Sequence, residues 1–270
     1  MISIIRYSDD RVEEWNQFNK QSKNYMFMFD RKYMDYHRDR FKDHSLMFYN
    51  DDKLISILPM SEHEGMLISH GGLTYGGFIT DKKMKQHTMN DCFDALIIYA
   101  REKGFKSIRY KCIPHIYHKQ SAEEDKFALF ANGAQLMTVD VSTYVNLSDP
   151  LKMPKGRKAQ ISRARREGVV IEELTELQDF NRFIELENEV LTQRHNVQAV
   201  HTGKELKLLH DRLPENIHLF AALKEENLIA GTVVYEYDQV IHTQYMAAND
   251  EARTVGACLL YTSPSPRDLS

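Results

Sequence analysis

The order of structural signals between residues 169 and 248 restricts the fold of this chain more than any other feature. VVIEEL predicts a strand, LQDFNRFIELENEVLTQRH and GKELKLLHDRL predict two amphipathic helices, and HLFAALK, LIAGTVVYEYD and VIHTQYMAA predict three strands. Turn residues at Glu225-Glu226-Asn227 and Asp238-Gln239 separate these last three runs, as in an antiparallel meander. This order predicts an α+β fold and differs from the strand–helix alternation of a Rossmann fold.

The first half of the chain carries a similar mixture of signals. SLMFYN and KLISILPM predict two strands joined at Asp51-Asp52, and MKQHTMNDCFDALIIYAREKGF predicts an amphipathic helix that ends at Gly104. Further on, SIRYKCI predicts a strand, FALFANGA a short helix and MTVDVSTYVNL another strand. The sequence therefore predicts two α+β halves in succession.

The stretch SDPLKMPKGRKAQ has the composition of a linker between the two halves, with Pro150, Pro154 and Gly156. It leads into KGRKAQISRARREG, which predicts a basic helix. We therefore expect an N-terminal domain over residues 1–149, a basic linker helix over 150–168 and a second domain over 169–257.

Composition excludes several classes of protein. Of 270 residues, 42% are hydrophobic and 27% are charged, which is typical of a globular chain and excludes disordered and collagen-like classes. No apolar run approaches the roughly 20 residues that span a bilayer, and the acidic start lacks the features of a secretory signal. We expect a cytoplasmic protein with no membrane span.

Cysteines and net charge narrow the function classes further. Cys92, Cys112 and Cys258 are far apart and form no C-x-x-C pair, so they predict reduced thiols and neither a disulfide framework nor a zinc ribbon. A net charge of −4 disfavours a general nucleic-acid coat, although a local basic patch is compatible with it.

Arg253-Thr-Val-Gly256-Ala257 follows the last predicted strand and resembles the Q/R-x-x-G-x-G/A turn of GNAT-superfamily acetyltransferases. In that family the turn presents backbone N–H groups to the coenzyme A pyrophosphate at the start of the next helix, where the helix dipole also favours an anion. The sixth position is Cys258, where the family has Gly or Ala. A structural turn is the alternative interpretation.

Longer stretches resemble bacterial GNAT-type proteins similar to the FemAB peptidyltransferases. They are FDRKYMDYHRDRFKDHSL, SHGGLTYGGF, YKCIPHIYHKQSAEEDKFALF and KGRKAQISRARREGV, and the resemblance runs from about Tyr25 to Ala257. It implies two tandem GNAT-like domains, each a mixed sheet flanked by helices. It also implies transfer of an acyl or aminoacyl group onto an amine.

The expected activity is transfer of an acyl group from acetyl-CoA or another acyl-CoA to an amino group of a cell-envelope precursor, such as a sugar nucleotide, lipopolysaccharide or muropeptide. One alternative is a FemAB-like peptidyltransferase that uses aminoacyl-tRNA, so tRNA is a partner only in that case. Another is a non-catalytic module that binds a saccharide or a protein.

The glycine cluster in SHGGLTYGGF is compatible with two interpretations. It lacks the G-x-G-x-x-G and GK[ST] patterns of nucleotide-binding loops, so its glycines indicate either tight backbone packing or a substrate-facing loop. Under the second interpretation His70 and Tyr75 bind substrate, and we add Lys111 to the predicted substrate-binding residues.

His115 and His118 precede Glu123, Glu124 and Asp125, a set of residue types that can ligate metals. Pro114 breaks regular structure there and the spacing matches no zinc motif, so a polar loop is favoured and no metal is predicted.

A dense basic run includes Lys155 and Arg157. Ile161, Ala164 and Gly168 give this helix a narrow apolar seam, so a solvated face is one interpretation. Binding of substrate phosphates through charge-assisted hydrogen bonds is the other, and it makes Lys155 and Arg157 substrate-binding residues.

Direct acyl transfer requires a base for the amine and a hydrogen-bond donor for the developing oxyanion. The resemblance implies backbone donors near Met246 and Ala247, and these two residues join Arg253 and Gly256 as predicted donor-binding positions. Glu236, His242 and Tyr245 are the predicted catalytic side chains, although alternation along a strand prevents all of the candidates on these strands from sharing one face.

The final residues, CLLYTSPSPRDLS, depart from the expected continuation of such a domain. Pro264 and Pro266 exclude a helix, and the segment resembles a translated sequencing-adapter tail. We therefore expect the second domain to be truncated near Gly256 and residues 258–270 to be non-native.

Overall fold

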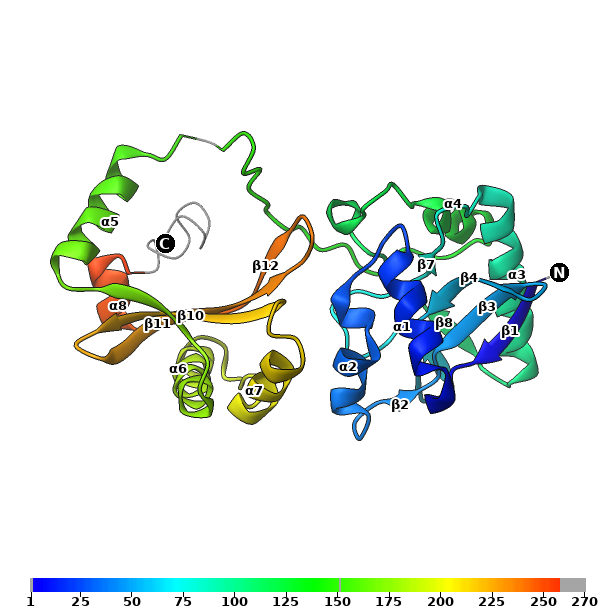
Figure 1. Cartoon of the computed structure of the whole chain (residues 1–270), viewed down its shortest axis with the longest axis horizontal. Coiled ribbons are helices and arrows are strands. Elements are labelled where there is room, and N and C mark those ends of the chain that lie inside the picture. Colours follow the sequence, from blue (N-terminus) through cyan, green and yellow to red (C-terminus); the bar gives the residue numbers. More distant parts are fainter. Residues whose placement is uncertain (1, 151, 258–270) are drawn as a thin grey trace. The chain divides into compact units, whose positions relative to one another are not determined.

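The computed structural model describes residues 2–150 and 152–257 (Figure 1). The chain forms two compact units, Met1–Thr138 with Tyr237–Val240 and Val139–Glu236 with Ile241–Ser270. Because Ile161 and Ala164 of the basic helix pack in the second unit's core, that helix belongs to this unit. The boundary expected at residue 150 stays a prediction. The tail expected at 258–270 lies outside the described residues.

The first unit contains two four-stranded sheets among its described residues. Its strands are β1 (Ile2–Arg6), β2 (Lys42–Asp43), β3 (Leu46–Asn50), β4 (Lys53–Leu58), β5 (Ser61–His63), β6 (Met66–Ile68), β7 (Ile79–Thr80) and β8 (Ser107–Arg109). Its helices are α1 (Val12–Gln21), α2 (Arg31–Met34), α3 (Gln86–Glu102) and α4 (Glu124–Ala131), with short 3-10 turns at Asp9–Arg11, Phe27–Phe29, Asp35–His37 and His115–Tyr117.

The sheets of the first unit have the orders β1-β3-β4-β7 and β2-β5-β6-β8. All pairs are antiparallel except β6 with β8, which run parallel. The predicted hairpin at Asp51-Asp52 is confirmed, with Asp51 at a φ of 53° as its turn residue. α3 packs against β1 and α4, and its buried face joins the strands in one apolar core that includes Phe78, Phe93 and Leu96.

The second unit follows the order that the sequence predicts. Its elements are α5 (Lys155–Arg166), β9 (Val170–Leu174), α6 (Leu177–His195), α7 (Gly203–Arg212), β10 (Ile217–Lys224), β11 (Asn227–Glu236), β12 (Ile241–Ala248) and α8 (Asp250–Val255). The sheet is antiparallel with the order β12-β11-β10-β9. The meander and its turns are therefore confirmed.

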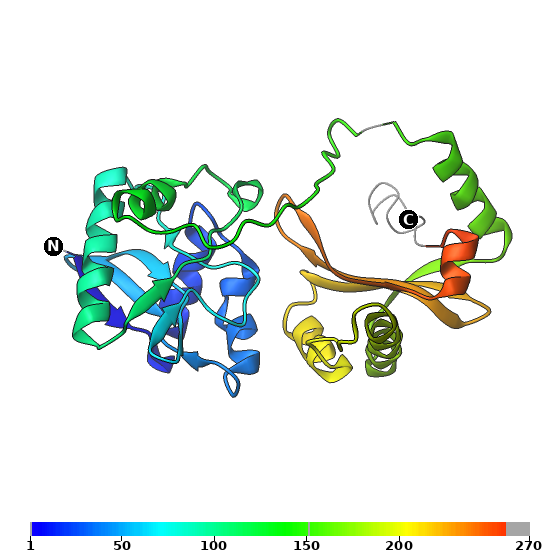
Figure 2. The same ribbon diagram turned by 180° about the vertical axis from the view of Figure 1, so that it is seen from behind.

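The sheet of the second unit has a helix pair on each face. α6 and α7 lie on one face, and α5 and α8 lie on the other (Figures 1 and 2). α6 packs closely on the sheet at Gly231 of β11. A Cβ at this position would lie 2.8 Å from Cδ2 of Phe183 on α6. On the opposite face Ala230 packs with Ile161 and Ala164 of α5.

One predicted strand is wrong. MTVDVSTYVNL alternates like a half-buried strand, but residues 137–146 form neither a helix nor a strand. Val139, Val141 and Val145 are exposed by 69%, 95% and 67%. A strand needs a partner edge for its backbone hydrogen bonds, and no strand within residues 2–150 and 152–257 supplies one to this segment.

Candidate active site

The two faces of the second unit's sheet separate the predicted catalytic residues. Gly231 faces α6, so alternation along β11 puts Tyr235 on the same face and Glu236 on the face of α5 and α8. His242 pairs with Tyr235 across the sheet and Tyr245 pairs with Val233, so both lie on the α6 face. A β-bulge at Gln244 lets residues 242 and 245 share that face.

Tyr245 lies at the centre of a polar cluster on the α6 face. Its hydroxyl hydrogen-bonds to Nδ1 of His201, a buried residue just before α7, and the two rings meet edge to face at 5.5 Å. Burial raises the pKa of Tyr245 to about 12, so the phenol is neutral at physiological pH. Burial also lowers the pKa of His242, against the opposing effect of a hydrogen bond with Gln244.

Glu187 of α6 lies on the same side of the sheet as Tyr245 and is not among the residues predicted from the sequence. The residue is only 6% exposed, and its Oε2 atom has no hydrogen-bond partner within the described residues. Burial raises the pKa of its carboxyl group to about 7, and its charge contributes to the raised pKa of Tyr245. A signal was present, because Glu187 interrupts the apolar series Phe180, Ile184 and Leu191 of this helix.

Glu236 belongs to a different group on the opposite face. His218 of β10 lies between two carboxylates, with Nδ1 2.6 Å from Oε1 of Glu173 and Nε2 3.9 Å from Oε2 of Glu236. The three predicted catalytic residues therefore do not form one cluster: His242 and Tyr245 share a face and Glu236 does not.

The predicted donor segment has a different local structure from the expected turn. Arg253 lies in the last turn of α8, and Gly256 ends that helix with a φ of 80°. The N–H groups of Arg253 and Gly256 donate to Asn249 and Ala252 within the segment. Residues 253–255 are therefore helical where the sequence predicts a turn, and any helix that opens beyond Ala257 lies outside the described residues.

The reason lies in residues 249–251. The Asn249 side chain accepts from the Ala252 N–H, and Asp250 and Glu251 occupy the first turn, where negative charge suits the helix dipole. These N-cap signals start the helix before Arg253. The two carboxylates also make the N-terminus of α8 a poor site for a pyrophosphate.

The other donor-site candidates lie near α8. Met246 is 56% exposed on the face of α5 and α8, opposite Thr232, whereas Ala247 is buried on the α6 face. The Arg253 guanidinium donates to Asp250 at 2.8 Å and to the Ala248 carbonyl at 2.7 Å. Lys155 and Arg157 are exposed on the first turns of α5, which packs against α8.

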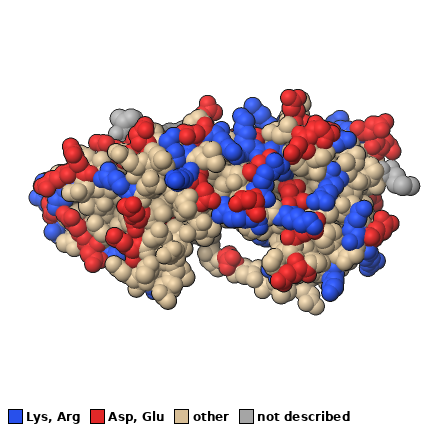
Figure 3. Space-filling view, turned by 90° about the horizontal axis from the view of Figure 1, so that it is seen from below, with Lys and Arg blue, Asp and Glu red and all other residues tan. Residues whose placement is uncertain are grey.

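Charges of both signs occur on the face of the molecule drawn in Figure 3. Basic and acidic side chains are interspersed over the face shown in Figure 3, in keeping with the net charge of −4.

In the first unit the glycine cluster packs tightly. A Cβ on Gly72 would lie 2.3 Å from Nε2 of His37, and one on Gly76 would lie 2.2 Å from the Ser69 carbonyl oxygen. Close packing thus accounts for these two glycines. His70 is 2% exposed and stacks on His37 at 5.2 Å, and burial together with this neighbour keeps the pKa of His70 low and its ring neutral.

Lys111, two residues after the end of β8, binds the carbonyl groups of the same loop. Its Nζ donates to the His70 carbonyl at 2.7 Å and to the Leu73 carbonyl, and burial lowers its pKa to about 8. Tyr75 is half-buried, with its hydroxyl 3.4 Å from that of Tyr117. His70 and Lys111 therefore have structural contacts, and substrate binding by the three residues stays a prediction.

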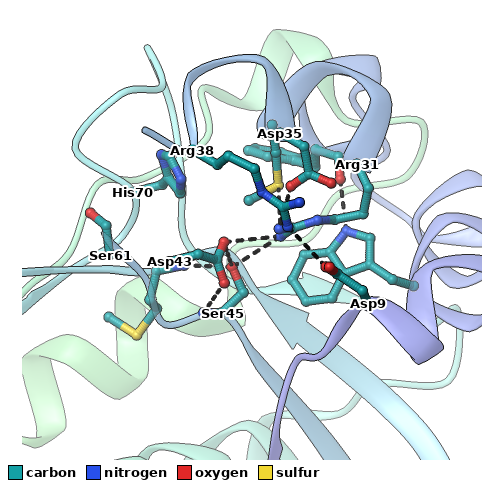
Figure 4. Close-up of polar contacts among 12 residues, drawn as sticks. Asp9, Arg31, Asp35, Arg38, Asp43, Ser45, Ser61 and His70 are labelled. Atoms are coloured by element: carbon teal, nitrogen blue, oxygen red, sulfur yellow. Dashed lines mark hydrogen bonds and ion pairs between the residues drawn. The ribbon is translucent and has the colours of Figure 1, made fainter. Parts of the chain in front are cut away.

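Arg31 holds a second polar network in the first unit (Figure 4). The guanidinium is 2% exposed, pairs with Asp35 at 2.6 Å and Asp43 at 3.0 Å, and lies 3.9 Å from the ring centroid of Tyr7. Asp43 also accepts from the Ser45 hydroxyl at 2.9 Å. Because its charges are paired with one another, this network has a structural role in the first unit.

No group of three or more His, Cys, Asp or Glu side chains in residues 2–150 and 152–257 is arranged to hold a metal ion. Among the helices in the same residues, none is both long and apolar enough to cross a bilayer.

Comparison with known proteins supports the fold. Residues 155–263 match the family model described as "Acetyltransferase (GNAT) domain". No curated protein matches the sequence. Among solved structures, FemX superposes with a TM-score of 0.64 at 10% identity, covering 96% of this chain and 84% of FemX.

Two further structures extend this likeness. L-PGS from Bacillus licheniformis superposes with a TM-score of 0.60 at 13% identity, covering 95% of this chain and 73% of L-PGS. A tandem GNAT protein from the clavulanic acid biosynthesis pathway gives 0.51 at 11% identity, with coverage of 97% and 83%. The chain therefore has the α+β fold of tandem GNAT-like proteins, with a GNAT acetyltransferase domain matched over residues 155–263.

Proposed function

We propose that this protein is an N-acyltransferase that moves an acyl group from acyl-CoA to an amino group of a cell-envelope precursor. The observation that carries the proposal is the GNAT acetyltransferase match over residues 155–263, which spans the whole meander and the polar cluster around Tyr245. We further propose that the reaction takes place in the cytoplasm, where acyl-CoA is available.

The proposed reaction is direct. The acceptor amine attacks the thioester carbonyl, a carbon–nitrogen bond forms, and the carbon–sulfur bond breaks without a covalent enzyme intermediate. Backbone groups at Met246 and Ala247 are the proposed donors to the developing oxyanion, and His242 and Tyr245 line the acceptor side. Cys112, an exposed thiol, has no role in this scheme.

The proposed contacts with the acyl donor involve positively charged side chains near α8. Because Arg253 pairs with Asp250 and the Ala248 carbonyl, Lys155 and Arg157 of the neighbouring helix α5 supply the proposed contacts. Such groups suit the phosphates of coenzyme A or of a nucleotide-linked acceptor. The same basic helix favours the aminoacyl-tRNA alternative, so the donor must be identified by experiment.

The donor test compares acetyl-CoA with an aminoacylated tRNA. With acetyl-CoA and a UDP-linked amino sugar, we expect acylation of the sugar amine, detected by mass spectrometry, and a rise in melting temperature on donor binding. Uncharged tRNA is the control for non-specific charge attraction. Transfer from aminoacyl-tRNA alone would replace the proposed donor, and saccharide binding without any transfer would favour a binding module.

A second prediction concerns α5. Changing both Lys155 and Arg157 to Ala is expected to weaken binding of the UDP-linked amino sugar by about tenfold at low salt, equal to about 1.4 kcal/mol. The loss should shrink as salt increases, because screening weakens the contribution of exposed charges. Isothermal titration at two salt concentrations measures both effects.

The matched control for this variant is Arg163→Ala, at the other end of α5. Arg163 pairs with Glu167 at 2.6 Å, so its removal changes the net charge without removing a proposed phosphate contact. Equal binding by the double variant and the wild-type protein would exclude Lys155 and Arg157 from the substrate site.

A further inference from the structure

We propose that Glu187 is the proton acceptor of the transfer reaction, receiving the proton that the acceptor amine releases as it attacks. This inference rests on the proposed function and adds a catalytic residue to it. It is independent of whether the donor is a CoA thioester or an ester of tRNA, because the amine must lose a proton in either case.

The first support is the position of Glu187. It projects from α6, which packs against β11 and β12, the two strands that carry the polar cluster. Its carboxylate is close enough to Tyr245 to influence the pKa of that phenol, and Tyr245 in turn bonds to His201. Glu187 thus joins the cluster from the helix side, while Glu236 lies on the opposite face of the sheet.

The second support is the absence of a structural partner. Buried carboxylates that stabilise a fold are paired with cations or hydrogen-bond donors, as Asp125 is with the Tyr110 hydroxyl and the Lys126 N–H. Glu187 is 6% exposed and its Oε2 atom has no partner in the described part of the chain. A carboxylate that is held at a cost to stability and left free to accept a hydrogen bond suits a chemical role.

The third support is the electrostatic setting. The titratable groups on the elements that pack against α6 are Tyr235 and Glu236 of β11, His242 and Tyr245 of β12, Lys204, Glu205, Lys207, His210, Asp211 and Arg212 of α7, and His201 before it, with Glu236 on the opposite face of the sheet. Burial is the cause that raises the pKa of Glu187 to about 7. A base with a pKa near the working pH is partly ionised and still strong enough to take a proton.

The acceptor nitrogen forms a bond to the carbonyl carbon and gives up one proton to the Glu187 carboxylate. The carbon–sulfur bond of an acyl-CoA breaks, its electron pair leaves on sulfur, and the thiolate takes a proton from solvent. Glu187 then returns its proton to solvent, which restores the carboxylate.

The experiment compares Glu187→Gln with Glu185→Gln, a matched control on the exposed side of the same helix. The assay uses acetyl-CoA and a UDP-linked amino sugar between pH 5.5 and 9. Wild-type kcat/KM should rise with pH through an ionisation near 7 and then level off. At pH 8, Glu187→Gln should lose about 100-fold in kcat with little change in the KM for acetyl-CoA.

The pH dependence separates a chemical role from a packing role. As the wild-type carboxylate becomes protonated, the difference between wild-type protein and Glu187→Gln should narrow to about threefold at pH 5.5. Glu185→Gln should keep the wild-type profile. If Glu187→Gln fails to fold, Glu187→Asp provides the second variant, and a reduced rate with a retained ionisation is then expected.

The outcomes for the inference and for the proposed function are distinct. An active wild-type protein whose profile is unchanged in Glu187→Gln overturns the inference and leaves the proposed function intact. A wild-type profile with no ionisation between pH 6 and 8 also overturns it, without any variant. Absence of transfer from either type of donor overturns the proposed function and this inference with it.

Discussion

Replacing Arg31 with Ala is expected to lower the free energy of unfolding of the first unit by about 3–5 kcal/mol. The guanidinium is 2% exposed and pairs with both Asp35 and Asp43 (Figure 4). Its removal leaves two carboxylates without their cation and empties the space beside the Tyr7 ring, 3.9 Å from the guanidinium carbon. The loss combines two uncompensated, partly buried charges with a packing defect.

Trp15 provides the measurement. It is the only tryptophan of the chain, is fully buried in the first unit, and lies 5.5 Å from the Arg31 guanidinium carbon. Its fluorescence during urea unfolding therefore reports on this unit and this network.

The control is Arg38→Ala. Arg38 pairs with Asp9 at 2.9 Å, but the two side chains are 56% and 72% exposed, so this change is expected to cost less than about 1 kcal/mol. Equal losses for the two variants would show that the Arg31 pairs contribute no more than a surface ion pair.

Replacing Glu187 with Gln is expected to stabilise the second unit at alkaline pH by about 3 kcal/mol. The ordinary carboxyl pKa of 4.5 is raised to about 7 in the folded protein, so the folded state holds the proton more tightly than the unfolded state. Between these two pKa values the folded state binds more protons, so stability falls as pH rises. Glutamine has a similar shape and no charge, which removes this cost.

The increase in the free energy of unfolding caused by Glu187→Gln should depend on pH. At pH 5 the side chain is protonated in the folded wild-type protein, and the difference between wild type and Glu187→Gln should be below about 1 kcal/mol. At pH 8.5 the difference in stability should approach about 3 kcal/mol. Thermal unfolding followed by circular dichroism at both pH values measures the change.

Glu185→Gln is again the control, because an exposed carboxylate has no burial cost to remove. A gain for Glu187→Gln that is the same at pH 5 and pH 8.5 would show that the side chain is not held with a raised pKa. Stabilisation together with loss of activity would mean that the chain keeps this carboxylate for its chemistry at a cost in stability.

Much of the second unit was predictable because its signals are local. The apolar series in α6, the polar turns at Glu225-Glu226 and Asp238-Gln239, and the alternation in β10 and β11 depend only on neighbouring residues. The same holds for the separation of Glu236 from the other candidate bases, which follows from the two-residue period of a strand. These patterns were sufficient for the α+β fold class.

Predictions failed where a pattern required a partner or competed with another signal. MTVDVSTYVNL alternates like a strand, yet a strand forms only where another edge accepts its hydrogen bonds. The R-x-x-G segment resembles a turn, but the Asn249 cap and the acidic residues after it start a helix earlier in the chain. The sequence therefore contains both a turn pattern and a helix-start pattern in this segment. In the folded unit the helix forms.

The sequence alone determined the order of the elements, the fold class and the candidate residues on β11 and β12. Only the tertiary structure decided which of these side chains meet and that Glu187 joins them. Helix and strand periodicity act over a few residues, so they can be read from the chain. The pKa of Glu187 depends on how completely α6, β11 and β12 exclude water around its carboxylate, and that exclusion exists only once these distant segments have packed together.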